Sequence, residues 1–126
     1  MVGTRNKPHS KQRRMKTLLK PHFKLRRWEF EHLVALMETR ALECYQSSQV
    51  ADKLIAAVLI GQASRLRPQM LRVRQEHSLR FSEVQALAFI AAFKEWQPGG
   101  KLEECSPMLV QHIFSRLSQC LELTTL

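Results

Sequence analysis

The chain has 126 residues and a net charge of +9, with 44% hydrophobic and 25% charged residues. This length fits one domain, which can bury about two thirds of the surface that the unfolded chain exposes. With only 4 Gly and 5 Pro, the chain lacks the many tight turns of a β-sandwich or barrel. A positive charge of this size points to an acidic partner: nucleic acid, a membrane surface or an acidic protein.

The positive charge is concentrated at the N-terminus. Residues 1–27 contain ten Lys and Arg and no Asp or Glu, whereas the remaining 99 residues hold 10 basic and 11 acidic side chains. Like charges at this density repel one another and cannot form a packed core. We therefore divide the chain into a flexible basic arm, residues 1–24, which we expect to be disordered without a partner, and a single helical domain, residues 25–126.

Cysteine usage and hydropathy indicate the compartment. Cys44, Cys105 and Cys120 form no C-x-x-C pair, so we expect reduced thiols in the cytoplasm or, in a eukaryotic cell, the nucleus. No apolar run approaches the ~20 residues of a membrane span, and none follows the basic start as in a secretory signal. We expect no membrane partner. A mitochondrial presequence is the alternative, although Pro8 and Pro21 interrupt any amphipathic helix in the arm.

Two helices are predicted in the first half of the domain. Over residues 27–46, apolar residues recur at three- and four-residue steps and form one stripe. Over residues 50–66, the segment 54–61 is the longest run without a charged or polar side chain, and Ser47 or Ser48 offers an N-cap. A helix that is apolar on nearly every side must be covered on nearly every side. We therefore predict that the helix over 50–66 is enclosed by the other segments.

Pro68 interrupts the helical pattern after this segment. Proline cannot donate a backbone hydrogen bond, and it disfavours helical geometry at the residue before it, Arg67. We expect a kink or a break near Arg67, with a second helical piece from Pro68 to about His77.

Two further helices are predicted from their capping residues. Ser82 opens the first, with Gln85 placed to complete a capping box, and this helix runs to about Trp96. Ser106 followed by Pro107 suits the N-cap and first position of the last helix. The predicted fold class is therefore all-α: a small bundle of four main helices plus a short or kinked helical piece after Pro68.

The sequence matches no catalytic motif. Gly99 and Gly100 precede Lys101 without the spacing or the flanking strand of a phosphate-binding loop. Glu103 and Glu104 are adjacent, so on regular structure their carboxylates point apart and cannot act as an acid–base pair. We expect no enzymatic activity and no cofactor.

Two possible binding motifs, a metal site and a helix-turn-helix, do not fit the sequence. Cys105, His112 and Cys120 could converge on a metal ion, but zinc requires a fourth ligand or an open catalytic position, so a core thiol is the simpler interpretation of Cys120. A helix-turn-helix with Gly61 at its turn would place Pro68 inside the recognition helix. We therefore expect no metal, and no reading of the major groove by this segment.

A second basic cluster lies in the middle of the chain. Five arginines fall between residues 65 and 80, opposed only by Glu76, and on a continuous helix Arg65 would share one side with Arg72, and Arg67 another with Arg74. Guanidinium groups suit bidentate contacts with phosphate. The other interpretation, a solvated face with arginine stems over the core edge, stays open. The predicted nucleic-acid contacts are Lys11, Arg13, Arg14, Lys16, Lys24, Arg26, Arg27, Arg65, Arg67, Arg72 and Arg74.

The helix over 82–96 has two apolar sides. Phe89, Phe93 and Trp96 form one of them, at i, i+4 and i+7. If the helix over 50–66 is the enclosed one, this aromatic side is left for a protein partner or a second copy of the chain. Core packing of the three aromatic residues is the alternative.

The concentration of positive charge favours one of two possible function classes. We expect a nucleic-acid-binding accessory or regulatory protein that contacts the phosphate backbone, with weak sequence specificity, through its arm and the arginine cluster. The alternative is a protein-interaction or oligomerisation module, an adaptor built on the aromatic side of the 82–96 helix.

Overall fold

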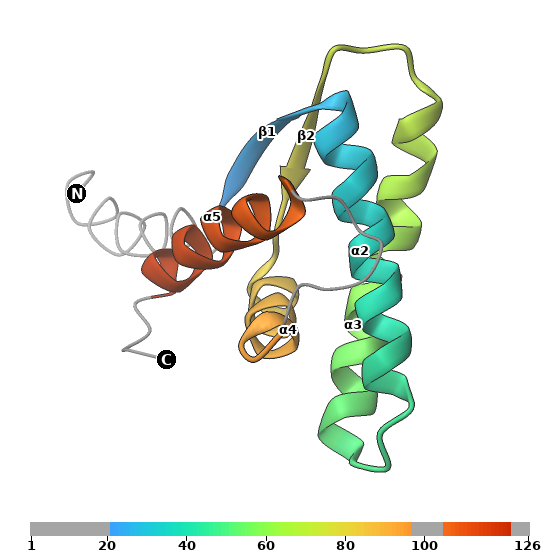
Figure 1. The fold of residues 1–126 in the computed structure, drawn as a ribbon, viewed down its shortest axis with the longest axis vertical. Coiled ribbons are helices and arrows are strands. Elements are labelled where there is room, and N and C mark those ends of the chain that lie inside the picture. The colour runs from blue at the N-terminus through green and yellow to red at the C-terminus, as the bar shows by residue number, and fades with distance from the viewer. Residues whose placement is uncertain (1–20, 97–104, 122–126) are drawn as a thin grey trace, which may run out of the picture.

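Two long helices in an antiparallel hairpin form one side of the molecule, and a two-stranded sheet and two shorter helices pack against it (Figure 1). The computed structural model describes residues 21–96 and 105–121, without the side chains of residues 105 and 106. The elements in chain order are β1 (His22–Arg26), α2 (Arg27–Tyr45), α3 (Val50–Leu66), the 3-10 helix η1 (Arg67–Leu71), β2 (Glu76–Arg80), α4 (Glu83–Phe93) and α5 (Cys105–Cys120).

The turn between α2 and α3 is held by local polar contacts. The Ser47 hydroxyl donates to Asp52 (2.6 Å) and accepts from the backbone N–H of Gln49 (3.0 Å). The ammonium of Lys53 donates to the carbonyl of Tyr45 (2.8 Å) and lies 4.2 Å from the centre of its ring. The predicted bounds of both helices are confirmed to within one residue, but Gln49, not Ser47 or Ser48, is the N-cap of α3.

The sheet was not predicted. β1 and β2 pair in antiparallel register, with Phe23 opposite Leu79. The helical piece expected from Pro68 to His77 is therefore wrong beyond Leu71, because the chain leaves η1, runs extended and enters β2. The fold is mostly helical with a small sheet, and the boundary that we drew at residue 24 falls inside β1.

An aromatic chain runs through the core from the sheet to α4. Phe23 meets Phe81 edge-on (ring centroids 5.8 Å apart), Phe81 meets Phe89 (5.6 Å), and Phe89 lies 4.5 Å from Phe93. His112 of α5 packs on the ring of Phe23 (6.0 Å). The core thus lies between the sheet, α2, α4 and α5, and α4 is in its middle.

The helix predicted to be enclosed is not. α3 buries only one side against the chain, through Ala56, Leu59, Gln62, Ala63 and Leu66, and it leaves Leu54 64% exposed. The capping box that opens α4 is confirmed: the Ser82 hydroxyl accepts from the backbone N–H of Gln85 (3.2 Å), whose side chain accepts from the backbone N–H of Ser82 (2.9 Å). α5 begins at Cys105, two residues before Pro107. Among the described residues, no helix is both long and apolar enough to cross a membrane.

Candidate nucleic-acid interface

The sheet has one buried and one exposed face, and the exposed face is basic. Burial alternates along both strands, with Phe23, Leu25, His77 and Leu79 facing the core. The exposed residues pair across the strands as His22 with Arg80, Lys24 with Ser78, and Arg26 with Glu76. Cross-strand neighbours lie about 5 Å apart at Cβ, so this small surface gathers three permanent positive charges and one negative charge.

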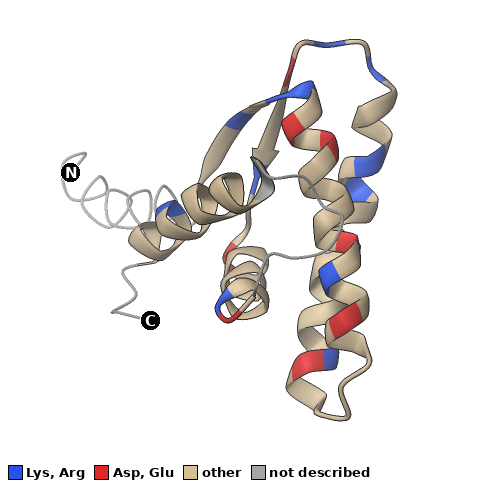
Figure 2. Ribbon diagram, viewed as in Figure 1, with Lys and Arg blue, Asp and Glu red and all other residues tan. Residues whose placement is uncertain are grey.

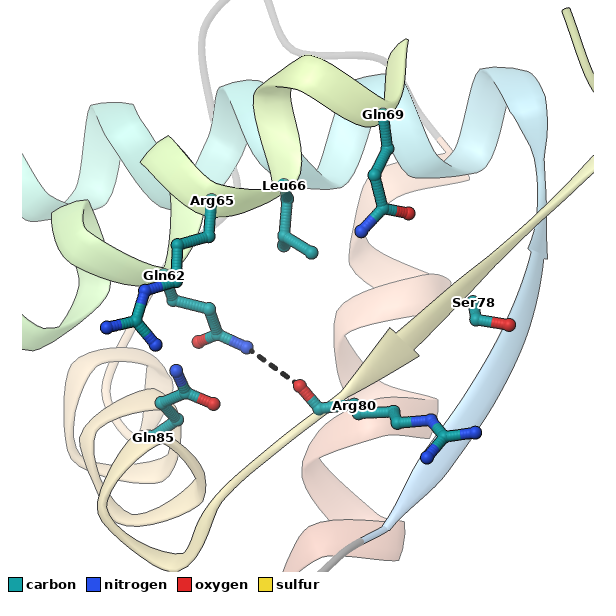
Figure 3. Close-up of a pocket in the computed structure, with 7 residues that line it drawn as sticks. All are labelled: Gln62, Arg65, Leu66, Gln69, Ser78, Arg80 and Gln85. Atoms are coloured by element: carbon teal, nitrogen blue, oxygen red, sulfur yellow. Dashed lines mark hydrogen bonds between the residues drawn. The ribbon is translucent and has the colours of Figure 1, made fainter. Parts of the chain in front are cut away.

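A polar groove of about 330 Å³ adjoins this face, between β2 and the end of α3. Gln62, Arg65 and Leu66 line it from α3, Gln69 from η1, Ser78 and Arg80 from β2, and Gln85 from α4. In Figure 3, Gln62 reaches from α3 toward β2, whereas the Arg80 side chain runs away from α3 toward β1. The groove and the exposed face of the sheet therefore share Arg80 and Ser78 and form one surface.

Gln62 places an unpaired acceptor in the groove. Its side chain is 3% exposed, and its amide nitrogen donates to the carbonyl of Arg80 at 3.4 Å. Its amide oxygen is buried and accepts no hydrogen bond from any described residue. A buried polar atom without a partner is costly, but this oxygen has almost no exposed surface, so a ligand in the groove would donate to it only after the Gln62 side chain or its neighbours move.

The connection between η1 and β2 adds two more arginines. Arg72 and Arg74 are exposed and alternate with Leu71 and Val73, which are 85% and 92% exposed. Since the chain is not helical here, the predicted sharing of sides by Arg65 with Arg72, and by Arg67 with Arg74, is wrong.

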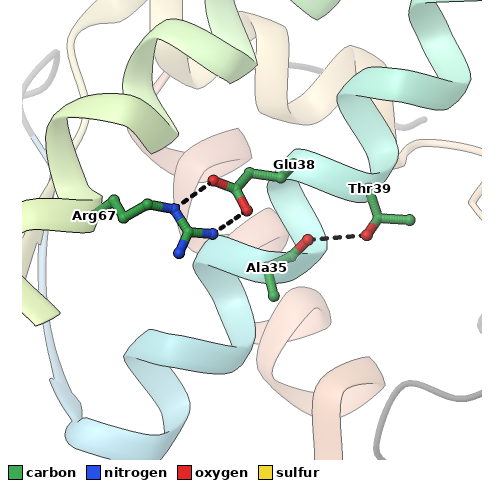
Figure 4. Close-up of polar contacts among 4 residues, drawn as sticks. All are labelled: Ala35, Glu38, Thr39 and Arg67. Carbon is green, nitrogen blue, oxygen red and sulfur yellow. Dashed lines mark hydrogen bonds and ion pairs between the residues drawn. The ribbon is translucent and has the colours of Figure 1, made fainter.

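Two of the predicted contact residues lie at the surface but are engaged in contacts with other residues of the chain. Arg67 forms a bidentate ion pair with Glu38 (Figure 4), in which its Nε donates to Oε2 over 2.8 Å. This hydrogen bond and the charge of Glu38 raise the pKa of Arg67 above its ordinary value. Arg27 donates to Glu31 (3.1 Å) and to the carbonyl of Met70 (3.2 Å). We therefore remove Arg27 and Arg67 from the set of phosphate contacts.

The Lys and Arg side chains of the described residues fall into two groups. Arg27, Arg40 and Arg67 pair with carboxylates, while Lys53 and Arg116 lie over aromatic rings. Seven others form no ion pair with a described residue, and six of these come from the sheet, the end of α3 and the connection between η1 and β2. We call these six residues the basic face. It consists of Lys24, Arg26, Arg65, Arg72, Arg74 and Arg80, and the seventh is Lys94.

Figure 2 shows how the charges are distributed. Blue segments lie along the sheet, the end of α3 and the connection to β2, whereas acidic and basic segments intermingle along the lower part of the α2–α3 hairpin. Arg40, near the C-terminal end of α2, donates to Glu43 (2.8 Å) and to the carbonyl of Ala92 (2.6 Å). Most of the unpaired positive charge of the described chain is therefore on one side.

The remaining predicted sites are four residues of the arm and the aromatic partner interface. Lys11, Arg13, Arg14 and Lys16 lie outside the described residues, so the arm stays a prediction. The predicted partner interface is wrong for its two phenylalanines: Phe89 is 0% and Phe93 4% exposed, and Trp96 packs edge-on against Phe93 (5.4 Å). The aromatic side of the 82–96 helix is part of the core because α4 turns this side, and not the side of Val84 and Leu87, toward the rest of the chain.

The titratable side chains of the described residues do not gather into a metal-binding cluster. No group of three His, Cys, Asp or Glu residues is placed to hold a metal ion there, and the side chain of Cys105 lies outside it. Burial raises the pKa of the Cys44 thiol, against the opposing charge of Arg40. A buried thiol with a raised pKa is a poor nucleophile.

Comparison with protein-family models, with curated proteins and with solved structures finds no match for this chain. The assignment of function therefore depends on the geometry of the basic face.

Sequence reasoning counted Arg80 in the arginine cluster but left it out of the predicted contacts, and it missed Ser78 and the groove glutamines. The signal was present as an alternation of polar and apolar residues in two segments, His22–Arg26 and Glu76–Arg80. Each segment has only five residues, and the first continues a run of positive charge that we assigned to the arm.

Proposed function

We propose that this protein binds nucleic acid, as a non-enzymatic accessory or regulatory protein, through the basic face and the N-terminal arm. The observation that carries the proposal is the segregation of charge. Six Lys and Arg side chains without a carboxylate partner among the described residues come from the sheet, the end of α3 and the connection to β2. Of the other described arginines, three pair with Glu31, Glu38 and Glu43, and Arg116 lies over the ring of Phe23.

Without a bound partner, repulsion between the charges of such a surface lowers the stability of the folded protein. Exposed like charges on neighbouring strand positions repel one another, and Glu76 is the only acidic residue on the exposed face of the sheet. Contact with a polyphosphate replaces this repulsion by attraction and releases condensed counterions. Five of the six members are arginines, whose planar guanidinium group matches phosphate oxygens bidentately.

The arm extends the same surface. Residues 1–20 carry seven further Lys and Arg and no acidic residue, and the described chain enters β1 immediately afterwards, beside Lys24 and Arg26. Phosphate contacts carry no base information, so the arm supplies affinity without sequence preference.

The groove is where bases could be distinguished. Gln62, Gln69 and Gln85 bring three amide groups to it, and amides can bond both donor and acceptor positions on a base edge. A nucleotide whose phosphate pairs with Arg65 would lie in the groove beside Gln62.

A charge-matched pair of variants tests the proposal. The face variant replaces Lys24, Arg74 and Arg80 with alanine, and the control variant replaces Lys53, Lys94 and Arg116, so both lose three positive charges. Binding to labelled duplex DNA, single-stranded DNA and single-stranded RNA is measured by fluorescence anisotropy at several salt concentrations. We expect weaker binding by the face variant and a log–log salt slope on duplex DNA that is shallower by about 2.7, because each phosphate contact contributes about 0.9.

Three results would contradict the proposal. One is an equal loss of affinity in both variants, because net charge alone would then explain binding. Another is the absence of binding to all three nucleic acids by the intact chain. The last is binding to vesicles that contain phosphatidylserine in place of nucleic acid, which would assign the basic face and the exposed Leu71 and Val73 to a lipid surface.

A further inference from the structure

The outward side of α3 is apolar, and no described residue covers it. Val50 is 81%, Leu54 64% and Ile60 40% exposed, and Ala57 and Gly61 are also exposed. These residues belong to the segment that we expected to be enclosed because of its apolar composition. The chain therefore leaves its longest uncharged run at the surface.

The two neighbouring helices extend this apolar surface. On the α2 side, Leu42 is 62% and Tyr45 59% exposed, and they line a groove of about 290 Å³ beside α3. On the α4 side, Val84 is 61% and Leu87 44% exposed, and they line a second groove, of about 310 Å³. Lys53 is the only charged residue that lines either groove, and it is bound to the carbonyl of Tyr45. α3 is therefore an apolar ridge between two apolar grooves.

The size of this surface suits a protein interface. From their exposed fractions, the seven large side chains, with Ala57 and Ala91 between them, present on the order of 800 Å², the area that each partner contributes to a standard-size interface. The largest apolar patch on a typical monomer is about 300–600 Å². Burial of the ridge by a partner of similar size therefore accounts for its composition.

Gly61 points to a close approach by a second helix. It lies inside α3, where glycine is less favourable for the helix than alanine because its backbone loses more conformational freedom. A Cβ atom at this position would meet nothing within 4 Å, so packing inside the chain does not require glycine here. A backbone without a side chain on an exposed apolar ridge allows another helix to approach closely from outside.

The ridge is complementary to itself. Val50, Leu54, Ala57 and Gly61 follow one another at i, i+4, i+7 and i+11, so they lie along one side of α3. The large side chains are at its N-terminal end and the small ones toward its C-terminal end. In an antiparallel pair about a two-fold axis near Ala57, Leu54 of each copy lies over Gly61 of the other, so the same residues form both halves of an isologous interface.

We propose that the chain forms a two-fold symmetric dimer in which the α3 ridges pack antiparallel, with Leu54 of each copy against Gly61 of the other and Ala57 near the axis. The ridge begins at the turn end of the α2–α3 hairpin, away from the connection that carries Arg72 and Arg74 (Figure 1). The dimer therefore leaves the exposed face of the sheet accessible in both copies. It does not depend on what that face binds.

Charge argues against two other occupants. The ridge offers a polyanion no positive charge other than Lys53, which is engaged with Tyr45. Residues 1–20 carry seven Lys and Arg, and to cover the ridge they would have to hold these charges against an apolar surface.

The experiment measures the molar mass of the full chain by light scattering during size exclusion, over about 5–200 µM. We expect a dimer for the unaltered protein and a monomer for Gly61→Arg, because an arginine at the contact blocks the approach of the second helix. Since space around Gly61 is open and arginine favours helix over glycine, the Gly61→Arg monomer should stay folded, with unchanged helical circular dichroism. Gln119→Arg adds the same charge at an exposed position of α5, and it should remain a dimer.

Cross-linking tests the geometry independently. Ala57→Cys, in a background with Cys105→Ser and Cys120→Ser, should form a disulfide-linked dimer on mild oxidation, whereas Gln119→Cys in the same background should not. A monomeric unaltered protein would overturn the proposal, as would a dimer that survives Gly61→Arg or no cross-link at residue 57. A monomer that dimerises only after deletion of residues 1–20 would also overturn it, because the arm would then be the natural cover of the ridge.

Discussion

Arg67 and Glu38 join the start of η1 to the middle of α2 through a bidentate ion pair. The pair lies where the chain leaves α3 and turns toward β2, and Arg27 holds the same turn through the carbonyl of Met70. Arg80, thirteen residues after Arg67, lines the groove and has no carboxylate partner among the described residues. The two arginines thus have separable roles in the fold and in binding.

This difference predicts opposite effects of two alanine substitutions. Arg67→Ala should lower the melting temperature and leave nucleic-acid affinity nearly unchanged, because it removes a contact within the fold. Arg80→Ala should lower affinity and leave the melting temperature unchanged. Thermal unfolding by circular dichroism and binding by anisotropy measure both, and Glu38→Ala serves as the control because it should reproduce the Arg67→Ala result. If the two substitutions had the same pair of effects, the separation of roles would be wrong.

Gln62 tests the groove without changing the charge. Gln62→Leu removes the unpaired buried oxygen together with a long hydrogen bond to Arg80, so we expect little change in the melting temperature. If a nucleotide donates to this oxygen, affinity falls while the salt slope stays the same, because the number of phosphate contacts is unchanged. Titrations at three salt concentrations measure both quantities. An affinity equal to that of the unaltered protein would exclude the groove from the contact surface.

Phe89 is predicted to be essential for the fold. Its side chain is 0% exposed and lies between Phe81 and Phe93, so Phe89→Ala should lower the free energy of unfolding by about 3–5 kcal/mol. Urea unfolding followed by tryptophan fluorescence measures the loss. Lys94→Ala, one residue after α4, should change stability little because the side chain is exposed. A stable Phe89→Ala protein would mean that the aromatic side of α4 is not core.

The helices could be predicted because each has a strong local signal. α2 carries a long stripe at helical spacing, α3 is long and apolar, and Ser82 and Gln85 form a capping box that fixes the start of α4. These signals depend on neighbouring residues alone. They are therefore visible without knowledge of the tertiary structure.

The sheet and the exposure of α3 could not be predicted in the same way. β1 and β2 are five residues long and separated by 49 residues, so neither strand has a partner that is near in sequence. Apolar composition shows that α3 needs cover, but it does not show whether the cover comes from the same chain. Of the basic face, Lys24, Arg26, Arg65, Arg72 and Arg74 were found from charge alone, and Arg80 and the groove required the strand register.

The buried thiol of Cys44 gives a prediction for alkaline pH. Burial raises its pKa above the ordinary 9.0, so the folded state holds the proton at a pH where the unfolded state releases it. The stabilisation from this group is complete below the ordinary pKa and declines as the pH rises above about 9.0. Urea unfolding at pH 7.5, 9 and 10 should therefore show a falling free energy of unfolding. Cys44→Ala should make that decline smaller, and an equal decline in both proteins would contradict the assignment.

The thiol should also react slowly. In a variant with Cys105→Ser and Cys120→Ser, iodoacetamide at pH 7.5 should modify Cys44 far more slowly in the folded protein than in urea, because thiolate is the reactive form and burial limits access. Rapid modification of the folded protein would show that α2 opens around this residue.

The arm gives the most direct prediction about binding. If about five phosphates of duplex DNA are contacted by the intact chain, the log–log salt slope should be near −4.5. Raising the salt concentration from roughly 50 to 200 mM would then weaken binding by several hundredfold. Replacing Lys11, Arg13, Arg14 and Lys16 with alanine should make the slope shallower by up to about 3.6 without changing the melting temperature.

The face variant provides the comparison that separates the arm from the sheet. If the arm and the basic face contact the same strand, each variant should reduce the slope, and their combination should reduce it further than either alone and bring it close to zero. A slope near zero in the intact protein would exclude phosphate contact altogether. A slope that the four arm substitutions leave unchanged, but that the loss of Lys24, Arg74 and Arg80 abolishes, would place the whole contact on the basic face and none on the arm.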